Sequence, residues 1–429
     1  MSDFHCDHLE EHRLDNGLRV QLHSDRRLPL VALNLWYHVG SKNERPGWTG
    51  FSHLFEHLLF QGSKNVDTNG HFRYIQQVGG TANGSTWYDR TNYYETLPSH
   101  HLERGLWLES DRMGTFLDAV TQQKLDTQRE VVINERRQRM DNQPYGRALE
   151  RLNEMLFPEG HSYRWPVIGS VADIEGADLD MVRHFFRTYY VPNNAVLTLA
   201  GDFEPDDALR RIEKFFGWIP RGDDVVQPEI EMPVLEQARH DVQTDHVHLP
   251  RLYMGAHCRP FATDEWYAAD LLTSLLAWGK ASPMYQDLVV RRRLAQDVSA
   301  FVMPTEAAST TLLIATAMPD VDLDELEAAI DGHLRDAGDR PPDEEALERT
   351  RRITLAQHFS RLQTLSDRAD RLSMFATFRG DPTLVWRESE RWRNIGPEDL
   401  RRFAAERLAP ERRATLRVVP EATTARADA

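Results

Sequence analysis

The residues best suited to chemistry lie in the run His53-Leu54-Phe55-Glu56-His57. Side chains four positions apart on a helix share one face, so His53 and His57 could hold a single ion of the size of zinc. Glu56 projects toward the same ion without having to bind it, which suits a base acting on water. The motif alone is only suggestive, because random placement would produce it roughly 0.1 times in such a chain. A pair of surface or core histidines is the alternative.

Catalytic zinc sites usually have three protein ligands and leave a fourth position open for water. The segment from Gln128 to Gln138 offers two carboxylates, Glu130 and Glu135, and is typical of a helix. Its inward stripe would contain Gln128, Val131, Val132 and Glu135. A carboxylate among inward valines is destabilising unless a positive charge compensates it. The sequence therefore predicts Glu135 as the third ligand, with pairing to an arginine as the alternative.

Hydrophobic periodicity predicts the elements that position these residues. The motif lies in an expected helix from Phe51 to Phe60, with Ser52 near its start, after a loop from Gly40 to Gly50. In the rest of the first half, alternating apolar and polar residues predict the strands, and apolar residues at helical spacing predict the helices. The expected strands are Leu18–His23, Val31–Val39, a pair within Thr81–Leu97 that turns near Asp89–Arg90, and Ala195–Ala200. The expected helices are His101–Phe116 and Lys124–Met140.

The second half repeats this order with different residues, which predicts a duplicated α+β unit. Its expected strands are Leu252–Cys258, Val298–Met303 and Thr310–Thr316, and its expected helices are Trp266–Trp278, Leu323–Leu334 and Glu344–Gln363. Between the halves, a stretch rich in proline and acidic residues is unsuited to a helix or a central strand. We therefore expect a catalytic zinc-binding domain at 1–218, a linker at 219–237 and a second domain without a metal site at 238–429.

Composition narrows the function. The formal net charge of -16 argues against a nucleic-acid groove, which needs Lys and Arg to neutralise phosphates. No apolar run is long enough to cross a membrane, and His5, Asp7, Glu10 and Glu11 stand where a signal peptide would be apolar. These features predict a cytoplasmic protein with no membrane or nucleic-acid partner. Cys6 and Cys258 are expected to be unpaired thiols.

Several phrases of the sequence resemble the M16 family of zinc peptidases, which includes pitrilysin, insulin-degrading enzyme and mitochondrial processing peptidase. The family signature is H-x-x-E-H followed about 75 to 80 residues later by a glutamate, and here Glu135 follows His57 by 78 positions. The resemblance covers nearly the whole chain. The similar phrases are Gly50–Ser63, Asn83–Tyr93, Asn134–Gln138, Trp278–Ser282 and Leu294–Val298.

The resemblance implies two α/β-sandwich units, each a mixed, largely antiparallel sheet with helices packed on one face. It implies one Zn2+ per chain, held by His53, His57 and Glu135, with Glu56 as the catalytic base of peptide hydrolysis. It also implies that a peptide substrate adds to the free edge of a strand. The residues of that strand are Asn83, Gly84, Ser85 and Thr86. An ordinary strand with a bulge at Gly84 is the alternative.

Two departures from the family pattern affect these expectations. Many relatives have an acid seven residues before the third ligand, where this chain has Gln128, which can donate a hydrogen bond near the site but adds no charge. Complete enzymes of the family also hold substrate with an Arg and a Tyr from the second half, and neither residue occurs from Ala295 to Pro319. The helix Trp266–Trp278 contains no histidine, which is why the second domain is expected to lack a metal site.

These departures lead to the expected assembly and function. We expect an endopeptidase that hydrolyses peptides or short unfolded polypeptides in a chamber formed with a second M16-like subunit, which supplies the missing Arg and Tyr. A homodimer that holds substrate with other residues is the alternative assembly. A non-catalytic assembly subunit is the alternative function, although a scaffold has no need of the complete motif. A small-molecule lyase of a related fold is disfavoured, because that fold is a single, much shorter unit.

Overall fold

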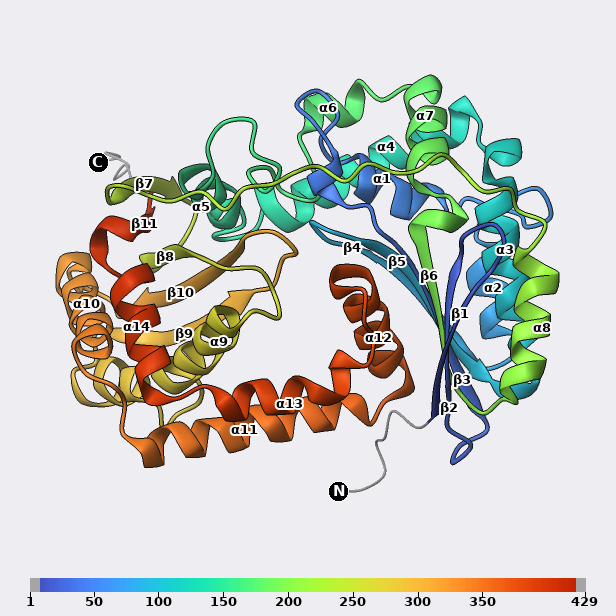
Figure 1. Cartoon of the computed structure of the whole chain (residues 1–429). Helices are drawn as coiled ribbons and strands as arrows, with labels where there is room; N and C mark the ends of the chain where they lie inside the picture. Colours follow the sequence, from blue (N-terminus) through green and yellow to red (C-terminus); the bar gives the residue numbers. More distant parts are fainter. Residues whose placement is uncertain (1–7, 422–429) are drawn as a thin grey trace. The chain divides into compact units, whose positions relative to one another are not determined.

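The computed structural model describes residues 8–421 and contains two compact units (Figure 1). Within the described residues, unit 1 comprises 8–135, 165–229 and 358–388, and unit 2 comprises 136–164, 230–357 and 389–421. Each unit is therefore built from segments of both halves of the chain. The division at 1–218, 219–237 and 238–429 stays a prediction. Cys6 and the first residues used for the localisation expectation lie outside the described range, whereas Cys258 is a buried free thiol.

Unit 1 contains a six-stranded mixed sheet of order β1-β2-β6-β3-β5-β4. The strands are β1 (Leu9–Arg13), β2 (Arg19–Ser24), β3 (Leu30–Tyr37), β4 (Thr81–Thr86), β5 (Thr91–Pro98) and β6 (Ala195–Gly201). Strands β2 and β6 are parallel, and the other pairs are antiparallel. Strand β3 is almost entirely buried, since it lies in the interior of the sheet with covered faces. Strand β4 is at an edge.

The helices of unit 1 cover one face of this sheet with their apolar stripes. They are α1 (Phe51–Leu58), α2 (Gly70–Gln76), α3 (Leu102–Ala119), α4 (Gln122–Arg136), α6 (Val171–Glu175), α7 (Leu179–Tyr189) and α8 (Pro205–Phe216). Helix α1 buries Phe51, Leu54, Phe55 and Leu58, the apolar positions of the expected helix. The core beneath it also contains Leu33 and Leu35 of β3.

Unit 2 contains a five-stranded sheet of order β7-β11-β8-β10-β9. The strands are β7 (Arg239–Asp245), β8 (Arg251–Cys258), β9 (Ala295–Met303), β10 (Ser309–Ala317) and β11 (Arg413–Pro420). Its helices include α5 (Ala148–Leu156), α9 (Asp264–Ala277), α10 (Leu323–Asp339) and α14 (Pro397–Arg407). Helices α11 (Glu344–Leu362) and α13 (Leu384–Asn394) each contain residues of both units.

The two sheets repeat one topology. Strands β2, β3, β4, β5 and β6 of unit 1 have the same order and the same parallel and antiparallel pairings as β7, β8, β9, β10 and β11 of unit 2. Only β1 has no counterpart among the described strands. The expected fold class, a duplicated α+β unit with mixed, largely antiparallel sheets, is therefore confirmed.

Each sheet also has a helix on its second face, which the sequence did not predict. In unit 1, α12 (Leu365–Arg379) packs on β6 and β3, where Ala369 contacts Ala32 and Ala200 (Figure 1). In unit 2, α5 packs on β8 and β11, and Leu152 and Leu156 lie over Gly255. Each of these helices comes from the half of the chain that does not supply the sheet. Alanine and glycine on the strands let the helix backbones approach closely.

The end of α4 differs from expectation. The helix expected to reach Met140 is α-helical only to Arg136 and continues as a π-helical turn, Arg137–Asp141. Such turns often lie beside functional sites, and this one begins two residues after Glu135. No helix in the range 8–421 has the length and apolar character needed to span a membrane. The cytoplasmic location stays a prediction.

Candidate metal centre

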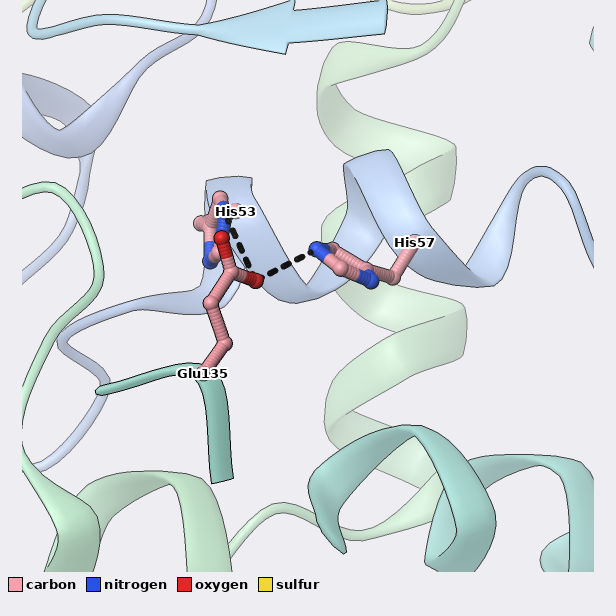
Figure 2. A group of neighbouring side chains, drawn as sticks. All are labelled: His53, His57 and Glu135. Carbon is pink, nitrogen blue, oxygen red and sulfur yellow. Dashed lines mark ion pairs between the residues drawn. The ribbon is translucent and has the colours of Figure 1, made fainter. Parts of the chain in front are cut away.

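Helices α1 and α4 bring the three expected ligands together. His53 and His57 lie one turn apart on α1, with ring centroids 4.8 Å apart, and the penultimate residue of α4, Glu135, points at both (Figure 2). Its Oε2 atom is 3.1 Å from Nε2 of His57 and 3.8 Å from Nε2 of His53. The arginine beside it, Arg136, forms an ion pair with Glu150 instead. The geometry thus favours the ligand hypothesis for Glu135 over pairing with that arginine.

The arrangement suits a small divalent cation. One ligand atom from each of the three residues lies within 4.8 Å of the others, and this is the only such group of His, Cys and acidic side chains found in residues 8–421. In tetrahedral zinc sites, metal–ligand lengths of about 2.0–2.1 Å place neighbouring ligand atoms about 3.3 Å apart. The distances of 3.1 and 3.8 Å therefore need only small adjustments. Two imidazoles and a carboxylate also form a donor set that zinc favours.

Glu56 is held by the neighbouring edge strand. The hydroxyl of Thr86 on β4 donates a hydrogen bond to Oε2 of Glu56 at 2.7 Å. A Cβ added to Gly84 would lie 3.1 Å from Cγ of Glu56, so the strand backbone passes close to this side chain. Burial raises the pKa of Glu56, and the bond from Thr86 opposes this in part. A carboxylate held in place with a raised pKa is suited to proton transfer near neutral pH.

The beginning of α1 is capped by a residue from the preceding loop. Gly50 is the N-cap and has φ of 86°, a conformation that favours glycine. The carboxyl group of Glu44 accepts hydrogen bonds from the backbone N–H groups of Gly50 and Ser52, at 2.8 and 2.7 Å. Ser52, expected near the helix start, is therefore a donor to the cap and does not provide it. Burial raises the pKa of Glu44 to about 8.

A buried cluster of charged side chains lies close to α1. Arg112 of α3 forms a fully buried ion pair with Glu109, and Glu109 shares a hydrogen bond with Glu95 of β5. Burial and the neighbouring Glu109 carboxylate raise the pKa of Glu95. The Arg112 guanidinium lies 3.9 Å from the ring centre of Tyr93, whose hydroxyl donates to the Phe55 carbonyl of α1. The cluster therefore contacts the metal-site helix through Tyr93.

The inward stripe of α4 differs from expectation at one position. Gln128 and Val132 are buried, but Val131 is 41% exposed, so it is not one of the inward residues. The inward line runs through Leu125, Gln128 and Val132 to Glu135, with alternating spacings of three and four. Val131 lies beside this line. Glu130 is exposed, as expected. Gln128 lies two turns before Glu135, and its influence on the metal stays a prediction.

The four residues expected to bind substrate form most of β4. Its pairing with β5 is continuous from Thr81 to Thr86, so Gly84 does not form a bulge. The Trp87 N–H donates to the Arg90 carbonyl at 2.8 Å, and pairing alternates along antiparallel strands. The backbone groups of Gly84 and Thr86 therefore point to the open edge, and the N–H of Gly84 is covered by Oδ1 of Asn83 at 2.9 Å.

Comparisons with known proteins identify the family of the chain. Residues 19–163 match the model of insulinase, peptidase family M16, and residues 176–354 match the model of the peptidase M16 inactive domain. The chain belongs to peptidase family M16. The model named for the inactive domain falls mostly on the second half, whereas His53, Glu56, His57 and Glu135 all lie within the first match.

Among similar proteins, the zinc protease PqqE of Helicobacter pylori is 29% identical over 358 residues, which cover 82% of this chain and 80% of PqqE. The crystal structure of a protease from Helicobacter pylori superposes with a TM-score of 0.91 at 27% identity, covering 96% of this chain and 99% of that one. A structure described as a peptidase M16 inactive domain, from Pseudomonas fluorescens, has a TM-score of 0.86 at 16% identity and covers 96% and 98%. The last similarity concerns the fold alone.

The sequence did not indicate the residues that support the ligands. Glu44 lies in a loop, and the only signal was an acidic residue before a glycine that starts a helix. Glu95, Glu109 and Arg112 carried no periodic signal, because charged residues are usually exposed and here they are buried together. Thr86 was expected to bind substrate, and in the structure its side chain faces Glu56.

Proposed function

We propose that this protein is a zinc-dependent endopeptidase. The observation that carries the proposal is the convergence of His53, His57 and Glu135 on one point, with the carboxyl group of Glu56 on the next turn of α1. Three protein ligands leave a fourth position for water, as in other catalytic zinc sites. The names of relatives such as PqqE support zinc and proteolysis.

A zinc ion at this site would act as a Lewis acid on water and on the scissile carbonyl. Glu56 would accept a proton from the attacking water and then donate it to the leaving amine, so that it ends the reaction in its starting state. The Thr86 hydroxyl would hold the Glu56 carboxylate in the orientation needed for the first of these transfers. Glu44 would hold the beginning of α1, and with it His53.

The substrate would bind as an added strand on β4. The outward backbone groups of Gly84 and Thr86 offer a donor and an acceptor each, which a peptide in extended conformation can match. Asn83, whose side chain now covers the Gly84 N–H, would turn away when the peptide binds. Because backbone groups make these bonds, preference for particular substrate sequences would be broad.

A second chain would complete the site. The segment from Ala295 to Pro319, which includes all of β9 and β10, contains no Arg or Tyr to hold a peptide. We infer a chamber formed with a related M16-like subunit that supplies them, and a homodimer is the alternative. A non-catalytic assembly subunit is a second candidate function, favoured by the match of residues 176–354 to the model of the peptidase M16 inactive domain.

One experiment tests the proposal. Zinc content and hydrolysis of a quenched-fluorescent peptide library are measured for the wild type and Glu56→Gln, alone and with a candidate partner subunit. We expect about one zinc per chain in both proteins, and turnover lower by at least roughly 100-fold in the variant, since Glu56 is a base and not a ligand. A wild type that binds zinc and hydrolyses nothing, alone or with partner, would support the assembly subunit. Equal rates with and without partner would exclude the need for a second, different subunit and would leave the homodimer.

A further inference from the structure

A chain of polar contacts runs from α12 to the edge strand β4. It begins at Asp370, which faces the side of the sheet opposite α1. One oxygen of Asp370, Oδ1, accepts hydrogen bonds from Nε1 of Trp36 at 2.9 Å and from the side-chain amides of Asn34 and Asn92, each at 3.3 Å. These three donors lie on β3 and β5 and are almost completely buried. A carboxylate oxygen is a strong hydrogen-bond acceptor, and this one accepts from three buried donors.

Asn92 links Asp370 to Arg90 through hydrogen bonds. While its Nδ2 donates to Asp370, its Oδ1 accepts from Nη1 of Arg90 at 3.0 Å and from Oγ of Ser85 at 2.7 Å. The amide is therefore a bridge between a carboxylate and a guanidinium. Since each charge polarises the amide in the same sense, the two hydrogen bonds strengthen each other in an interior of low dielectric.

Arg90 in turn holds β4. Its Nη1 donates to the backbone carbonyl of Ser85 at 2.8 Å and to the Ser85 hydroxyl at 2.6 Å, and its guanidinium lies over the ring of Trp36. Ser85 stands between Gly84 and Thr86, the residues with outward backbone groups. A shift of Ser85 would therefore move both the open edge and the hydroxyl that contacts Glu56.

We propose that Asp370 is a positioning residue for peptide binding, and that it fixes the edge of β4 through Asn92, Arg90 and Ser85. Asp370 comes from the half of the sequence that carries no metal ligand, so α12 contributes to the site without contacting it. The effect on substrate rests on the proposed peptidase function, whereas the effect on β4 does not. A displaced edge weakens ground-state binding, so the Michaelis constant changes more than the turnover number.

The test compares Asp370→Asn with Ser373→Ala. Ser373 lies on the same helix and shares a 2.7 Å hydrogen bond with Thr198 of β6, away from β4. Backbone amide exchange of residues 81–86 is measured in both variants, together with peptide hydrolysis, peptide affinity in a Glu56→Gln background, and zinc content. We expect Asp370→Asn to accelerate exchange of 81–86 and to raise KM and the dissociation constant about 10-fold, with kcat changed less than about threefold and zinc content unchanged. Ser373→Ala should change none of these.

Restoration by the conservative variant gives a second readout. Asp370→Glu keeps the charge and should recover part of the affinity that Asp370→Asn loses. Unchanged exchange and KM in Asp370→Asn, or equal changes in Ser373→Ala, would overturn the inference. If the wild type neither hydrolyses nor binds peptides, the proposed function fails, and the exchange comparison still decides whether Asp370 positions β4.

Discussion

The two units share one strand topology, but the helices at equivalent positions, α1 in unit 1 and α9 in unit 2, are very different. In unit 1, α1 follows β3 and spans only eight residues, of which His53, Glu56 and His57 are polar and partly or largely buried. In unit 2, α9 follows β8 and buries an apolar surface that includes Trp266, Leu271 and Leu272. Helix α9 is capped by its own N-cap residue, Thr263, whereas α1 is capped by the carboxyl group of Glu44 in the preceding loop.

The difference shows what a polar site requires from its surroundings. A helix such as α9 is stabilised mainly by packing, because most of its buried side chains are apolar and need no polar partner. Buried imidazoles and carboxylates need compensation, and unit 1 provides it with Glu44 at the helix start, Thr86 beside Glu56 and the cluster around Arg112. The topology is shared, and the chemistry depends on these additional contacts.

The largest expected effect concerns zinc itself. Replacing both His53 and His57 by Ala should reduce bound zinc from about one equivalent to near zero, since two of three ligands are lost. Plasma emission spectrometry after dialysis measures this. His257, a buried histidine of unit 2, is the matched control, and His257→Ala should keep the metal. If the double variant still bound zinc tightly, the zinc site would lie elsewhere in the chain. The proposed difference between the two repeats would then be wrong.

Breaking an ion pair should lower the free energy of unfolding more in unit 1 than in unit 2. Arg112→Met leaves Glu109 buried without its cation and should lower the free energy of unfolding by about 3–5 kcal/mol. In unit 2, Arg413 pairs with Asp331, whose side chain is 26% exposed and can be hydrated after the change. Arg413→Met should therefore lower the free energy of unfolding by only about 1–2 kcal/mol. Urea denaturation of both variants measures the difference, and equal losses would contradict the comparison.

The cap of α1 should make stability depend on pH. The pKa of Glu44 is raised to about 8 in the folded state by burial, above its value in the unfolded chain. The folded state therefore retains a proton that the unfolded chain releases, and this contribution is complete at low pH and is lost as the pH rises through 8. Relative to Glu44→Gln, which cannot titrate, the wild type should lose stability between pH 5 and 8, by up to about 1.4 kcal/mol per pH unit.

Urea unfolding at several pH values tests this difference, in which the other titrating groups cancel. Parallel curves for the wild type and Glu44→Gln would show that Glu44 does not titrate in this range. Glu44→Ala should be the less stable variant at every pH, because the N–H groups of Gly50 and Ser52 lose their acceptor.

The smallest effect is expected at the edge of β4. In Gly84→Ala the new methyl group would lie 3.1 Å from Glu56 and from Phe60, so both must shift by a few tenths of an ångström. We expect kcat to fall about two- to fivefold with little loss of stability. Gly105→Ala on α3 meets only ordinary contacts of 3.6 and 3.7 Å and is the control. A larger loss of activity in the control would mean that Gly84 has no special relation to Glu56.

Most elements near the site were predictable because their signals are local. The periodic apolar residues of α1 and the alternation in β4 and β5 gave these elements with boundaries close to those observed. The apolar periodicity of α4 predicted the buried side of the helix correctly except at Val131. That residue lies at the margin of the buried stripe and is exposed. The π-helical turn after Arg136 was not predicted, since the extra residue in the turn leaves no pattern in the sequence.

The sequence by itself determined the residues that can meet at the metal centre, because the spacing of His53, Glu56 and His57 is set by one helical turn. It also predicted a duplicated α+β unit, since two sets of strands and helices follow in the same order. Only the tertiary structure decided which distant side chains hold the site in place, among them Arg112 and Asp370. Their roles depend on burial and on contacts between residues far apart in the chain. No local period records such contacts.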